Sequence, residues 1–389
     1  MKIAVIGTGT VGVMSFLHFL KYLDNSEVTC IYNPAKKILG VGESSNVSLP
    51  HLLWNAANYS VFIDSKELSS TIKLGVKYIN WRKNDFISPI LPTHYAMHFD
   101  NFKLAEVMFK RAKKIYGKRF KTLNKNIKEL KQNNKEVTIL FDKGKKTYDY
   151  VIDCRGYPDD YSNYHECTSL PINRAFVNLV REPGDWNYTY HYAHKNGWMF
   201  GIPLTNRQGW GYLFNDKITS EQEAVNEINE IFKSNKKKED LRDFNFKPYR
   251  SKTFLNNRII KNGNRAIFYE PLEALSGVFY DGINRWFFDY ISNKVDEETL
   301  NTFLDERAKQ YENFIAWIYN QGSIHNTKFW SYAKQITTKH LTKNLIWENT
   351  KTYLKKNTHE DNLCKTWPFT KTSWEILLKG FNAALVKGV

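Results

Sequence analysis

The 389-residue sequence has few cysteines and no long apolar segment. Its four cysteines form no CxxC pair, which argues against a disulfide framework and an all-protein zinc site. No apolar run approaches the ~18 residues that a membrane span needs, and the glycines after the first apolar residues fit a turn better than a signal peptide. We therefore expect a cytoplasmic protein with reduced thiols and no membrane partner.

The net charge of +16 is not concentrated in one segment. Lysines recur among asparagines, as in 121–146 and 233–238, without a recognisable reading helix or zinc finger. A nucleic-acid-binding protein is the alternative from another class, but scattered charge favours solvated faces that attract small anions. We therefore expect no nucleic-acid partner.

The N-terminal segment follows the pattern of a dinucleotide-binding unit. Residues 2–6 predict a buried strand, 13–23 a helix and 28–32 a second strand, with a glycine-rich turn after the first strand. Later segments predict an alternating strand, a helix capped at Asp100 or Asn101, and two further strands, at 71–81, 102–116, 136–141 and 150–154.

The middle and the end of the chain have different patterns. Residues 171–260 are rich in aromatics and alternation, which predicts an antiparallel sheet. Beyond Gly277 the chain reads as helical, with 297–319 the longest candidate. We expect one compact α/β body over residues 1–330 and a helical segment over 331–389 packed on it.

The turn reads Gly7-x-Gly9-x-x-Gly12. Missing side chains there let backbone N–H groups and the helix N-terminus approach a pyrophosphate. The acidic residue that would bind the adenosine ribose after the second strand is absent, since Tyr32 and Asn33 stand there. That departure makes NAD the poorer candidate.

Seven further segments form a series. They read GVGES (40–44), IKLGVKYINW (72–81), MHFDNFKLAEVMFKR (97–111), DCRG (153–156), GWMFGIP (197–203), EPLEALSG (270–277) and KFW (328–330). With the glycine turn, they resemble flavin-dependent halogenases of the tryptophan-halogenase family, whose motifs run GVGEAT, FKxxIxFxNW, WHFD, DCSG, GWxWxIP, EPLESTG and a late FW. The matches follow the family order from residue 1 to about 330.

The resemblance implies an FAD-binding, Rossmann-like, flavoprotein monooxygenase-like module with an antiparallel sheet layer and a helical C-terminal part. It implies an FADH2-dependent oxidoreductase that uses halide ion and a small aromatic substrate. A separate flavin reductase is the expected partner, because no second nucleotide fold is visible. The expected cofactor contacts are Gly7, Gly9, Thr10, Gly12, Gly42, Glu43, Ser44, Asp153 and Gly156.

The resemblance also implies two catalytic residues. Lys73 stands at the place of the halogen-transferring lysine, which holds hypohalous acid by hydrogen bonding or as a haloamine. Shielding from water lowers the pKa of such an amine and keeps part of it neutral. Glu273 stands at the place of the carboxylate that stabilises the attacked arene and removes its proton. Lys77 is interpreted as a surface lysine and Glu270 as a structural acid.

The turn Leu275, Ser276 and Gly277 is expected to offer backbone N–H groups to halide. ALSG is one residue longer than the family's STG and lacks its threonine. Because heavier halides are easier to oxidise, we expect bromide or iodide to be favoured over chloride. EPLE also stands where aromatic hydroxylases carry a GD signature, which favours a halogenase over the alternative, an FAD-dependent aromatic hydroxylase.

The remaining candidates concern the substrate and the path of the oxidant. Trp198, Phe200 and Pro203 match the motif that keeps substrate away from flavin, and His98 either fixes the following helix or lines the substrate side. No metal site is predicted, because His191 and His194 would point to opposite faces of a strand. The segments after Trp81 and at the C-terminus are shorter than in the family, which predicts an open pocket for electron-rich indoles or phenols.

Overall fold

The computed structural model describes all residues except 37, 39, 41–42, 357–361 and 384–389. A six-stranded sheet carries the N-terminal turn, in the order β20 (Leu255–Asn256), β21 (Ile259–Lys261), β12 (Tyr150–Asp153), β1 (Lys2–Ile6), β2 (Glu27–Tyr32) and β8 (Phe120–Asn124). The strands from β21 to β8 run parallel. Their carboxyl ends therefore meet at one edge, where the turn after β1 lies beside the turn after β12.

The second large sheet has seven strands. Their order is β18 (Arg242–Asn245), β14 (Arg174–Val180), β17 (Gln208–Phe214), β16 (Gly197–Pro203), β15 (Thr189–His194), β5 (Gly75–Ile79) and β6 (Phe86–Pro89). The strands that fall in 171–260 pair antiparallel, as predicted. The junction between β15 and β5 is parallel, and it brings an N-terminal segment into this sheet.

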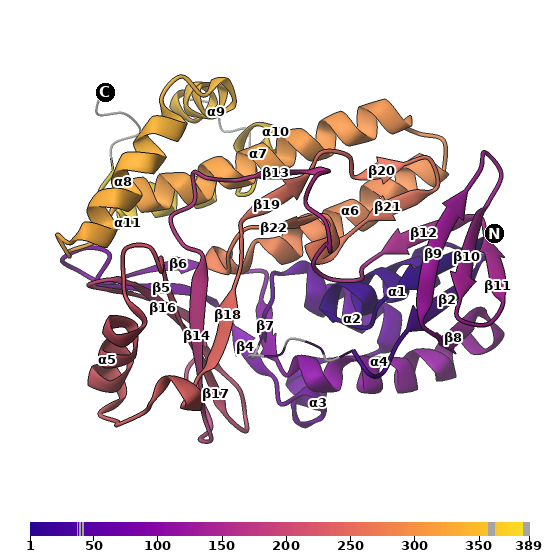
Figure 1. Cartoon of the computed structure of the whole chain (residues 1–389), viewed down its shortest axis with the longest axis horizontal. Helices are drawn as coiled ribbons and strands as arrows, with labels where there is room; N and C mark the ends of the chain where they lie inside the picture. Colours follow the sequence, from indigo (N-terminus) through magenta and orange to yellow (C-terminus); the bar gives the residue numbers. More distant parts are fainter. Residues whose placement is uncertain (37, 39, 41–42, 357–361, 384–389) are drawn as a thin grey trace.

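Three small sheets complete the β structure. They are β11 (Lys145–Tyr148), β10 (Val137–Phe141) and β9 (Ile127–Gln132); β13 (Tyr164–Glu166), β19 (Tyr249–Ser251) and β22 (Ile267–Phe268); and β3 (Glu43–Ser44), β7 (Ala96–Phe99) and β4 (Thr71–Lys73). The last of these positions the candidate site. Figure 1 shows β9, β10 and β11 at the end of the molecule near the N-terminus, with α5 at the opposite end.

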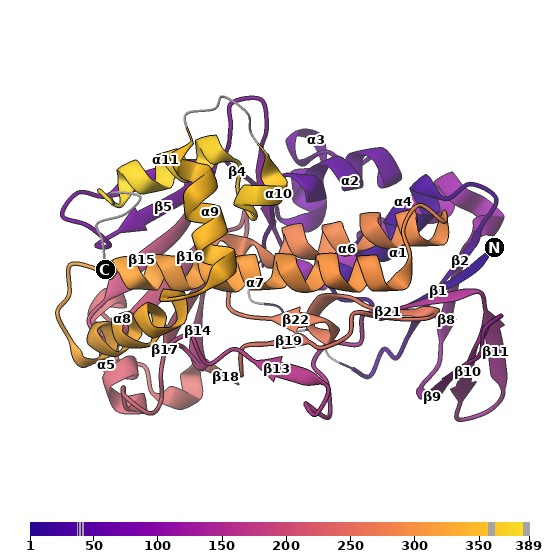
Figure 2. The same cartoon turned by 90° about the horizontal axis from the view of Figure 1, so that it is seen from above.

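The helices cover the sheets and dominate the chain after residue 275. They are α1 (Thr10–Tyr22), α2 (Ser48–Ala57), α3 (Val61–Leu68), α4 (Asn101–Tyr116), α5 (Glu221–Phe232), α6 (Ser276–Ile291), α7 (Glu297–Gln321), α8 (Lys328–Leu341), α9 (Leu345–Lys355), α10 (Leu363–Thr366) and α11 (Lys371–Gly380). Helix α4 begins as predicted, because the Asp100 side chain accepts a hydrogen bond from the Phe102 N–H. Both views show α7, the longest helix expected, along the long axis of the molecule (Figures 1 and 2).

One apolar core joins both large sheets and the C-terminal helices. It contains Val5 of β1, Trp198 of β16 and Trp317 of α7. The α/β fold class with a helical C-terminal part is therefore confirmed. The division at residue 330 stays a prediction, and helix α8 runs across it. Among the described residues, no helix is both long enough and apolar enough to cross a membrane.

The expected single strand over 71–81 is wrong. The chain forms β4 and β5 in two different sheets, with the exposed Leu74 between them. Gly75 allows the break, because a Cβ there would lie 2.4 Å from the Ser88 carbonyl oxygen. Lys73 and Lys77 therefore do not share a surface: Lys73 is buried, whereas Lys77 lies half-buried over the Tyr190 ring.

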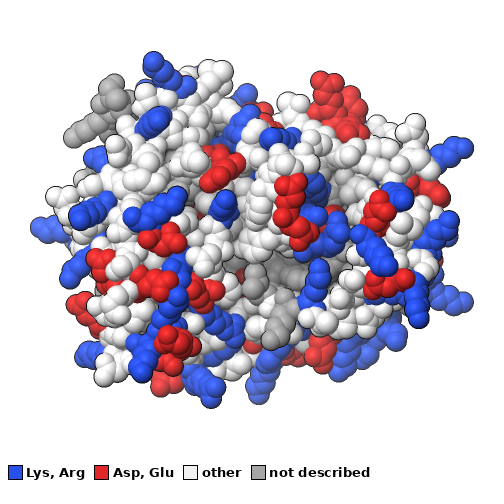
Figure 3. All heavy atoms as spheres, viewed as in Figure 1, with Lys and Arg blue, Asp and Glu red and all other residues white. Residues whose placement is uncertain are grey.

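The charged side chains on the face shown in Figure 3 are dispersed. Lysines and arginines alternate with aspartates and glutamates, and the surface is hollowed near its middle. Several exposed cations are paired, as in Lys121 with Glu27 and Lys294 with Asp289. This dispersal agrees with the solvated faces expected from the sequence.

Candidate active site

The glycine turn brings backbone atoms close together at the start of α1. A Cβ on Gly12 would lie 2.1 Å from the Gly7 carbonyl oxygen, and one on Gly7 would lie 2.7 Å from the Cys154 carbonyl oxygen. At Gly9, the N-cap of α1, a Cβ would meet nothing within 4 Å, and the first helical turn carries no acid. The N–H groups of α1 thus face open space that suits an anionic phosphate.

Other expected cofactor residues lie at the start of α1, after β12 and in β3. The Thr10 hydroxyl donates to Asn101, and the Glu43 backbone pairs with Phe99 in the small sheet. Gly156 has φ +84°, which only glycine adopts readily. Gly42 lies outside the described residues.

Asp153 at the end of β12 is held by arginines of this chain. Its two carboxylate oxygens accept bonds from Arg155 at 2.8 and 2.7 Å, and Arg265 lies 3.4 Å away. Burial opposes ionisation, but the Arg155 hydrogen bonds and the two positive charges keep the pKa of Asp153 below its ordinary value. Arg155 occupies the third position of DCRG, where the family motif has serine, and a role of Asp153 in flavin binding stays a prediction.

Lys73 ends strand β4 in the interior of the molecule. Its side chain is 4% exposed, and its amine donates to the Ser44 Oγ at 2.9 Å and to the Ser45 carbonyl oxygen at 3.2 Å. The acceptors are the last residue of GVGES and the residue that follows it, and β7 joins the strand β3 at the end of this motif to β4 in one sheet. Burial lowers the pKa of Lys73 to about 8, and the charge of Glu273 limits the fall.

Glu273 reaches the same region from the turn before α6. Its backbone and that of Ala274 are in the left-handed region, with φ +62° and +54°, which costs about 1–3 kcal/mol for each non-glycine residue. The carboxylate accepts a hydrogen bond from the Tyr78 hydroxyl. Burial raises the pKa of Glu273 to about 7, although the Tyr78 hydrogen bond and the Lys73 charge act against the rise.

Glu270, three residues earlier, has a different environment. Its Oε2 accepts a hydrogen bond from the Tyr319 hydroxyl at 2.7 Å, and Tyr319 in turn accepts one from Trp198 Nε1 at 2.7 Å. Burial raises the pKa of Glu270 to about 8. These contacts tie the turn to α7 and β16 and fit the structural interpretation of this acid.

The turn expected to bind halide forms the start of α6. The Ser276 hydroxyl lies 3.2 Å from the Tyr311 hydroxyl, and Leu275 is buried. The Asn46 side-chain nitrogen lies 3.4 Å from where a Cβ on Gly277 would stand, and it has no hydrogen-bond partner among the described residues. A buried amide donor is therefore present beside this turn.

The residues expected along the oxidant path are buried on β16. Trp198 and Phe200 belong to the core that joins the two sheets, and the Pro203 carbonyl accepts from the Thr71 hydroxyl at 2.8 Å. Nearby, His191 is fully buried, and neither ring nitrogen has a partner within the described part of the chain. Burial and then the charge of Lys73 hold the pKa of His191 well below its usual range.

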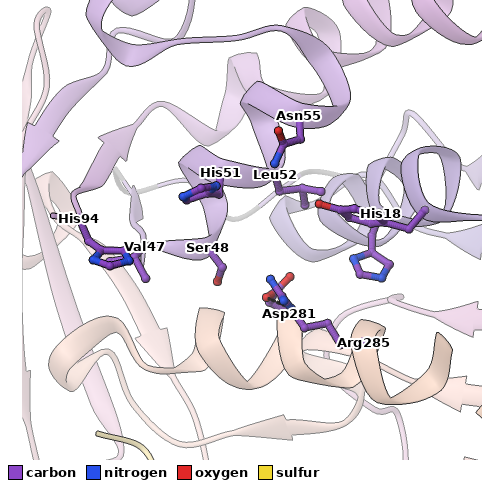
Figure 4. A pocket seen from close by; sticks show the side chains of 10 residues that line it. His18, Val47, Ser48, His51, Leu52, Asn55, His94, Asp281 and Arg285 are labelled. Atoms are coloured by element: carbon purple, nitrogen blue, oxygen red, sulfur yellow. Dashed lines mark hydrogen bonds and ion pairs between the residues drawn. The ribbon is translucent and has the colours of Figure 1, made fainter. Parts of the chain in front are cut away.

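Within the described part of the chain, clefts open at two places on the surface that Lys73 and Glu273 do not line. The first encloses about 370 Å³, and Figure 4 shows His18, Ser48 and Asp281 pointing into the space between α1, α2 and α6. The second encloses about 570 Å³ between the small sheet of β13 and helices α7 and α9. The lysine and the glutamate thus belong to the interior, where water has little access.

Comparisons with known proteins agree with this geometry. The family model for tryptophan halogenases matches residues 2–88 and 82–385. The chain is 21% identical to tryptophan 7-halogenase RebH of Lentzea aerocolonigenes, over 86% of this chain and 79% of RebH. It is also 21% identical to tryptophan 6-halogenase ThaL of Streptomyces albogriseolus, over the same shares of both chains.

Solved structures show the same fold at low sequence identity. A tryptophan halogenase from Shewanella frigidimarina gives a TM-score of 0.80 at 16% identity, over 100% of this chain and 90% of that one. BrvH, a flavin-dependent halogenase from Brevundimonas sp. BAL3, gives 0.79 at 17% identity, over 98% and 89%. The chain therefore shares the fold of flavin-dependent halogenases. Since the family model spans nearly the whole chain, the protein belongs to the tryptophan halogenase family of flavin-dependent halogenases.

Sequence reasoning missed the partners of the two catalytic candidates. Tyr78 lies in the same motif as Lys73, and its place on the buried face of that motif was the available signal. Thr189, which lies 2.8 Å from the Ser44 hydroxyl, belongs to no motif. Only the parallel pairing of β15 with β5 brings it there.

Proposed function

We propose that this protein oxidises halide to hypohalous acid at FADH2 and passes the halogen through Lys73 to an electron-rich arene. The single observation that supports the proposal is the buried Lys73 amine, held by two hydrogen bonds and electrostatically coupled to the buried Glu273. We further propose that a separate cytoplasmic reductase supplies the reduced flavin.

The residues present suit FAD. The open space at Gly9 and the uncapped α1 N-terminus would hold the pyrophosphate. When bound in its reduced form, the flavin with oxygen supplies the two-electron oxidation of halide. The chain's own part is to exclude water and to guide the oxidant to an amine.

At Lys73 the proposed transfer is a balanced exchange. The amine lone pair forms an N–X bond as the O–X bond of hypohalous acid breaks, and hydroxide leaves as water with one N–H proton. The arene carbon then takes the halogen as the N–X bond breaks and its electron pair returns to the nitrogen, and the ring proton passes through Glu273 to that nitrogen. A pKa of about 8 leaves far more neutral amine at pH 7 to 8 than an ordinary lysine has.

Glu273 assists the second half of this exchange. Its carboxylate stabilises the positive charge on the attacked ring and accepts the ring proton. A pKa of about 7 suits a group that must take up a proton and release it in each cycle. The Tyr78 hydroxyl orients the carboxylate by donating to one of its oxygens.

Halide and substrate preferences are proposed from the sequence and from the fold. We place halide at the α6 N-terminus, beside Ser276 and Gly277, and expect bromide or iodide to react faster than chloride. We propose indoles or phenols as substrates, without a requirement for free tryptophan.

The decisive experiment compares Lys73→Ala with Lys77→Ala. Each variant is supplied with FAD, a flavin reductase, NADH, oxygen, bromide and indole, and bromoindole is measured by mass spectrometry. Lys73→Ala should lose bromoindole by about 100-fold or more, as expected when a transfer group is removed, yet still oxidise bromide trapped by a scavenger. Lys77→Ala should match the wild type, since Lys77 lies half-buried on Tyr190.

Two results would contradict the proposal. Wild-type formation of bromoindole by Lys73→Ala would show that the halogen does not pass through this lysine. A product carrying only oxygen in halide-free buffer would instead identify an FAD-dependent aromatic hydroxylase on the same scaffold.

A further inference from the structure

A chain of hydrogen bonds runs from Lys73 to a backbone carbonyl on another sheet. The heavy-atom distances are 2.9 Å from Lys73 Nζ to Ser44 Oγ, 2.8 Å from Ser44 Oγ to Thr189 Oγ1, 3.0 Å from Thr189 Oγ1 to His98 Nε2, 3.0 Å from His98 Nδ1 to Thr71 Oγ1 and 2.8 Å from Thr71 Oγ1 to the Pro203 carbonyl oxygen. Lys73, Thr189 and His98 are at most 4% exposed, and Ser44 and Thr71 are half-buried. Burial of the amine, the ring and the Thr189 hydroxyl limits competition from water at the centre of the chain.

The Pro203 carbonyl at the far end sets the direction of the two bonds nearest to it, from Thr71 to Pro203 and between His98 and Thr71. A carbonyl oxygen only accepts, so the single Thr71 hydroxyl proton is used on Pro203. Thr71 must then accept from His98 Nδ1–H. Burial and the Lys73 charge hold the pKa of His98 well below its usual range, so the ring is neutral and its Nε2 accepts.

The same reasoning carries the direction on to the amine. Because His98 Nε2 accepts, Thr189 must donate to it, and Thr189 Oγ1 can then only accept the Ser44 hydroxyl proton. Ser44 Oγ in turn accepts from Lys73. Every donor in the chain points away from the lysine.

This direction decides what happens at the Lys73 nitrogen. A neutral primary amine has two N–H bonds and one lone pair, and the two N–H bonds are used on Ser44 and on the Ser45 carbonyl. The Ser45 carbonyl has no proton to give, and the Ser44 proton is committed to Thr189. The lone pair, which must attack the halogen, is therefore not capped by either neighbour.

Ser44 is a departure from the family motif. The motif GVGEAT has alanine at this position, where this chain has GVGES. The Ser44 hydroxyl adds a second hydrogen-bond acceptor for the Lys73 amine. It also adds a donor that could rotate and donate to the lone pair of that amine. Such a residue needs a partner that takes its proton, and Thr189 is that partner.

We propose that Thr189 is a positioning residue that keeps the Ser44 hydroxyl from capping the lone pair of Lys73. This inference rests on the proposed transfer through Lys73 and goes beyond it. The titratable groups that face the lysine from the packed elements are Glu273, His98 and His191. All three remain unchanged in the variants below, so a change in pH dependence comes from the two hydroxyls.

The test uses Thr189→Val, Ser44→Ala and the double variant in the full-length protein. Val is nearly isosteric with Thr and suits a strand. The substrates are bromide and indole with FADH2 from an added reductase. The measured quantity is coupling, the share of oxidised bromide that becomes bromoindole rather than bromide oxidant caught by a scavenger.

Thr189→Val should lower coupling by about tenfold, the order expected for one misdirected hydrogen bond. Ser44→Ala should lower it by less, because only one anchor is lost. The double variant should recover to the level of Ser44→Ala, since no hydroxyl is left to cap the amine. In Thr189→Val the pH below which coupling falls (the acid limb of its pH profile) should also decrease. The Ser44 hydroxyl then donates to the lone pair of Lys73, which stabilises the neutral amine and lowers its pKa.

Controls separate this effect from general damage. Thr189→Ser keeps the hydroxyl and should restore coupling, whereas Thr189→Ala serves as a smaller hydroxyl-free variant if Val impairs folding. Thr29→Val removes another buried strand hydroxyl in the six-stranded sheet and should leave coupling unchanged.

Additive losses in the double variant, or an unchanged acid limb in Thr189→Val, would overturn the inference while leaving the proposed function intact. Undiminished coupling in Lys73→Ala would overturn the proposed function itself, whatever the hydroxyl variants show.

Discussion

The glycine turn and the lysine–glutamate site are assembled in opposite ways. The turn spans residues 7–12, uses backbone atoms and leaves its N–H groups in open space. The site collects Ser44, Lys73, Tyr78 and Glu273 from three distant segments and buries all of them except Ser44, which is half-buried. The proposed phosphate site is thus built from neighbouring residues, whereas distant parts of the chain must come together to exclude water around the Lys73 amine.

The difference teaches that the two regions respond to different changes. Function at the turn depends on shape, because a Cβ at two of its glycines would meet backbone atoms. Function at the site depends on protonation, because burial moves the pKa values of Lys73 and Glu273 toward neutrality. Steric variants should therefore damage the first region most, and charge variants the second.

The largest effect is expected from Gly12→Ala. The new Cβ would stand 2.1 Å from the Gly7 carbonyl oxygen, and neither backbone atom can move without distorting the turn. We expect a loss of about 3 kcal/mol or more in the free energy of unfolding, together with lost FAD binding. Thermal melts and flavin fluorescence titrations measure both.

Gly9→Ala is the matched variant, because its Cβ meets nothing within 4 Å of protein. It should melt like the wild type and bind FAD more weakly, since the methyl group occupies the approach of the pyrophosphate. Wild-type FAD binding by Gly12→Ala would contradict the claim that function at the glycine turn depends on its shape.

The next effect is expected from Glu273→Gln. The amide is nearly isosteric but cannot take the ring proton, so bromoindole formation should fall by about 10²- to 10⁴-fold, the range for lost acid–base catalysis. Bromide oxidation and FAD affinity should persist. Product yields by mass spectrometry give the answer, with Glu270→Gln as the control at the neighbouring structural acid. An equal loss in both variants would contradict the separate roles of these glutamates.

A smaller effect is the pH dependence of coupling, which should differ from that of FAD binding at the glycine turn. Deprotonation of Glu273 near pH 7 and of Lys73 near pH 8 should raise coupling several-fold between pH 6 and 8.5. FAD affinity should change much less, because the first turn of α1 contains no acid. Parallel measurement of both quantities tests this, and a coupling that is flat with pH would argue against a titrating amine.

The smallest effect on the reaction itself is expected at Glu270, where the change is in stability. Its folded pKa of about 8 exceeds the unfolded value near 4.5, so the folded state binds more protons and loses stability as the pH rises between these values. Glu270→Gln removes that loss and should gain stability over the wild type by up to about 1.4 kcal/mol per pH unit within this window. Urea unfolding at pH 5 and pH 8 measures it. A difference that shrinks with rising pH would contradict the raised pKa.

Much of the fold was predictable, because its signals are local. The buried strand over 2–6, the glycine turn and the Asp100 cap each reveal themselves within a few residues. The strand over 71–81 was not predictable, because its alternation continues through Leu74 and only the pairing with Ser88 and Pro89 shows the break. Long-range pairing therefore overruled a locally consistent pattern.

The sequence alone determined which chemistry the chain carries: glycines at the turn, a lysine and a glutamate in recognisable motifs, and their order. It could not determine burial or partners. Only the tertiary structure brought Tyr78 to Glu273 and Thr189 to Ser44, because these side chains are 195 and 145 positions apart in the sequence. The pKa values of Lys73 and Glu273 follow from that enclosure, since desolvation is a property of the packed interior and not of the residue type.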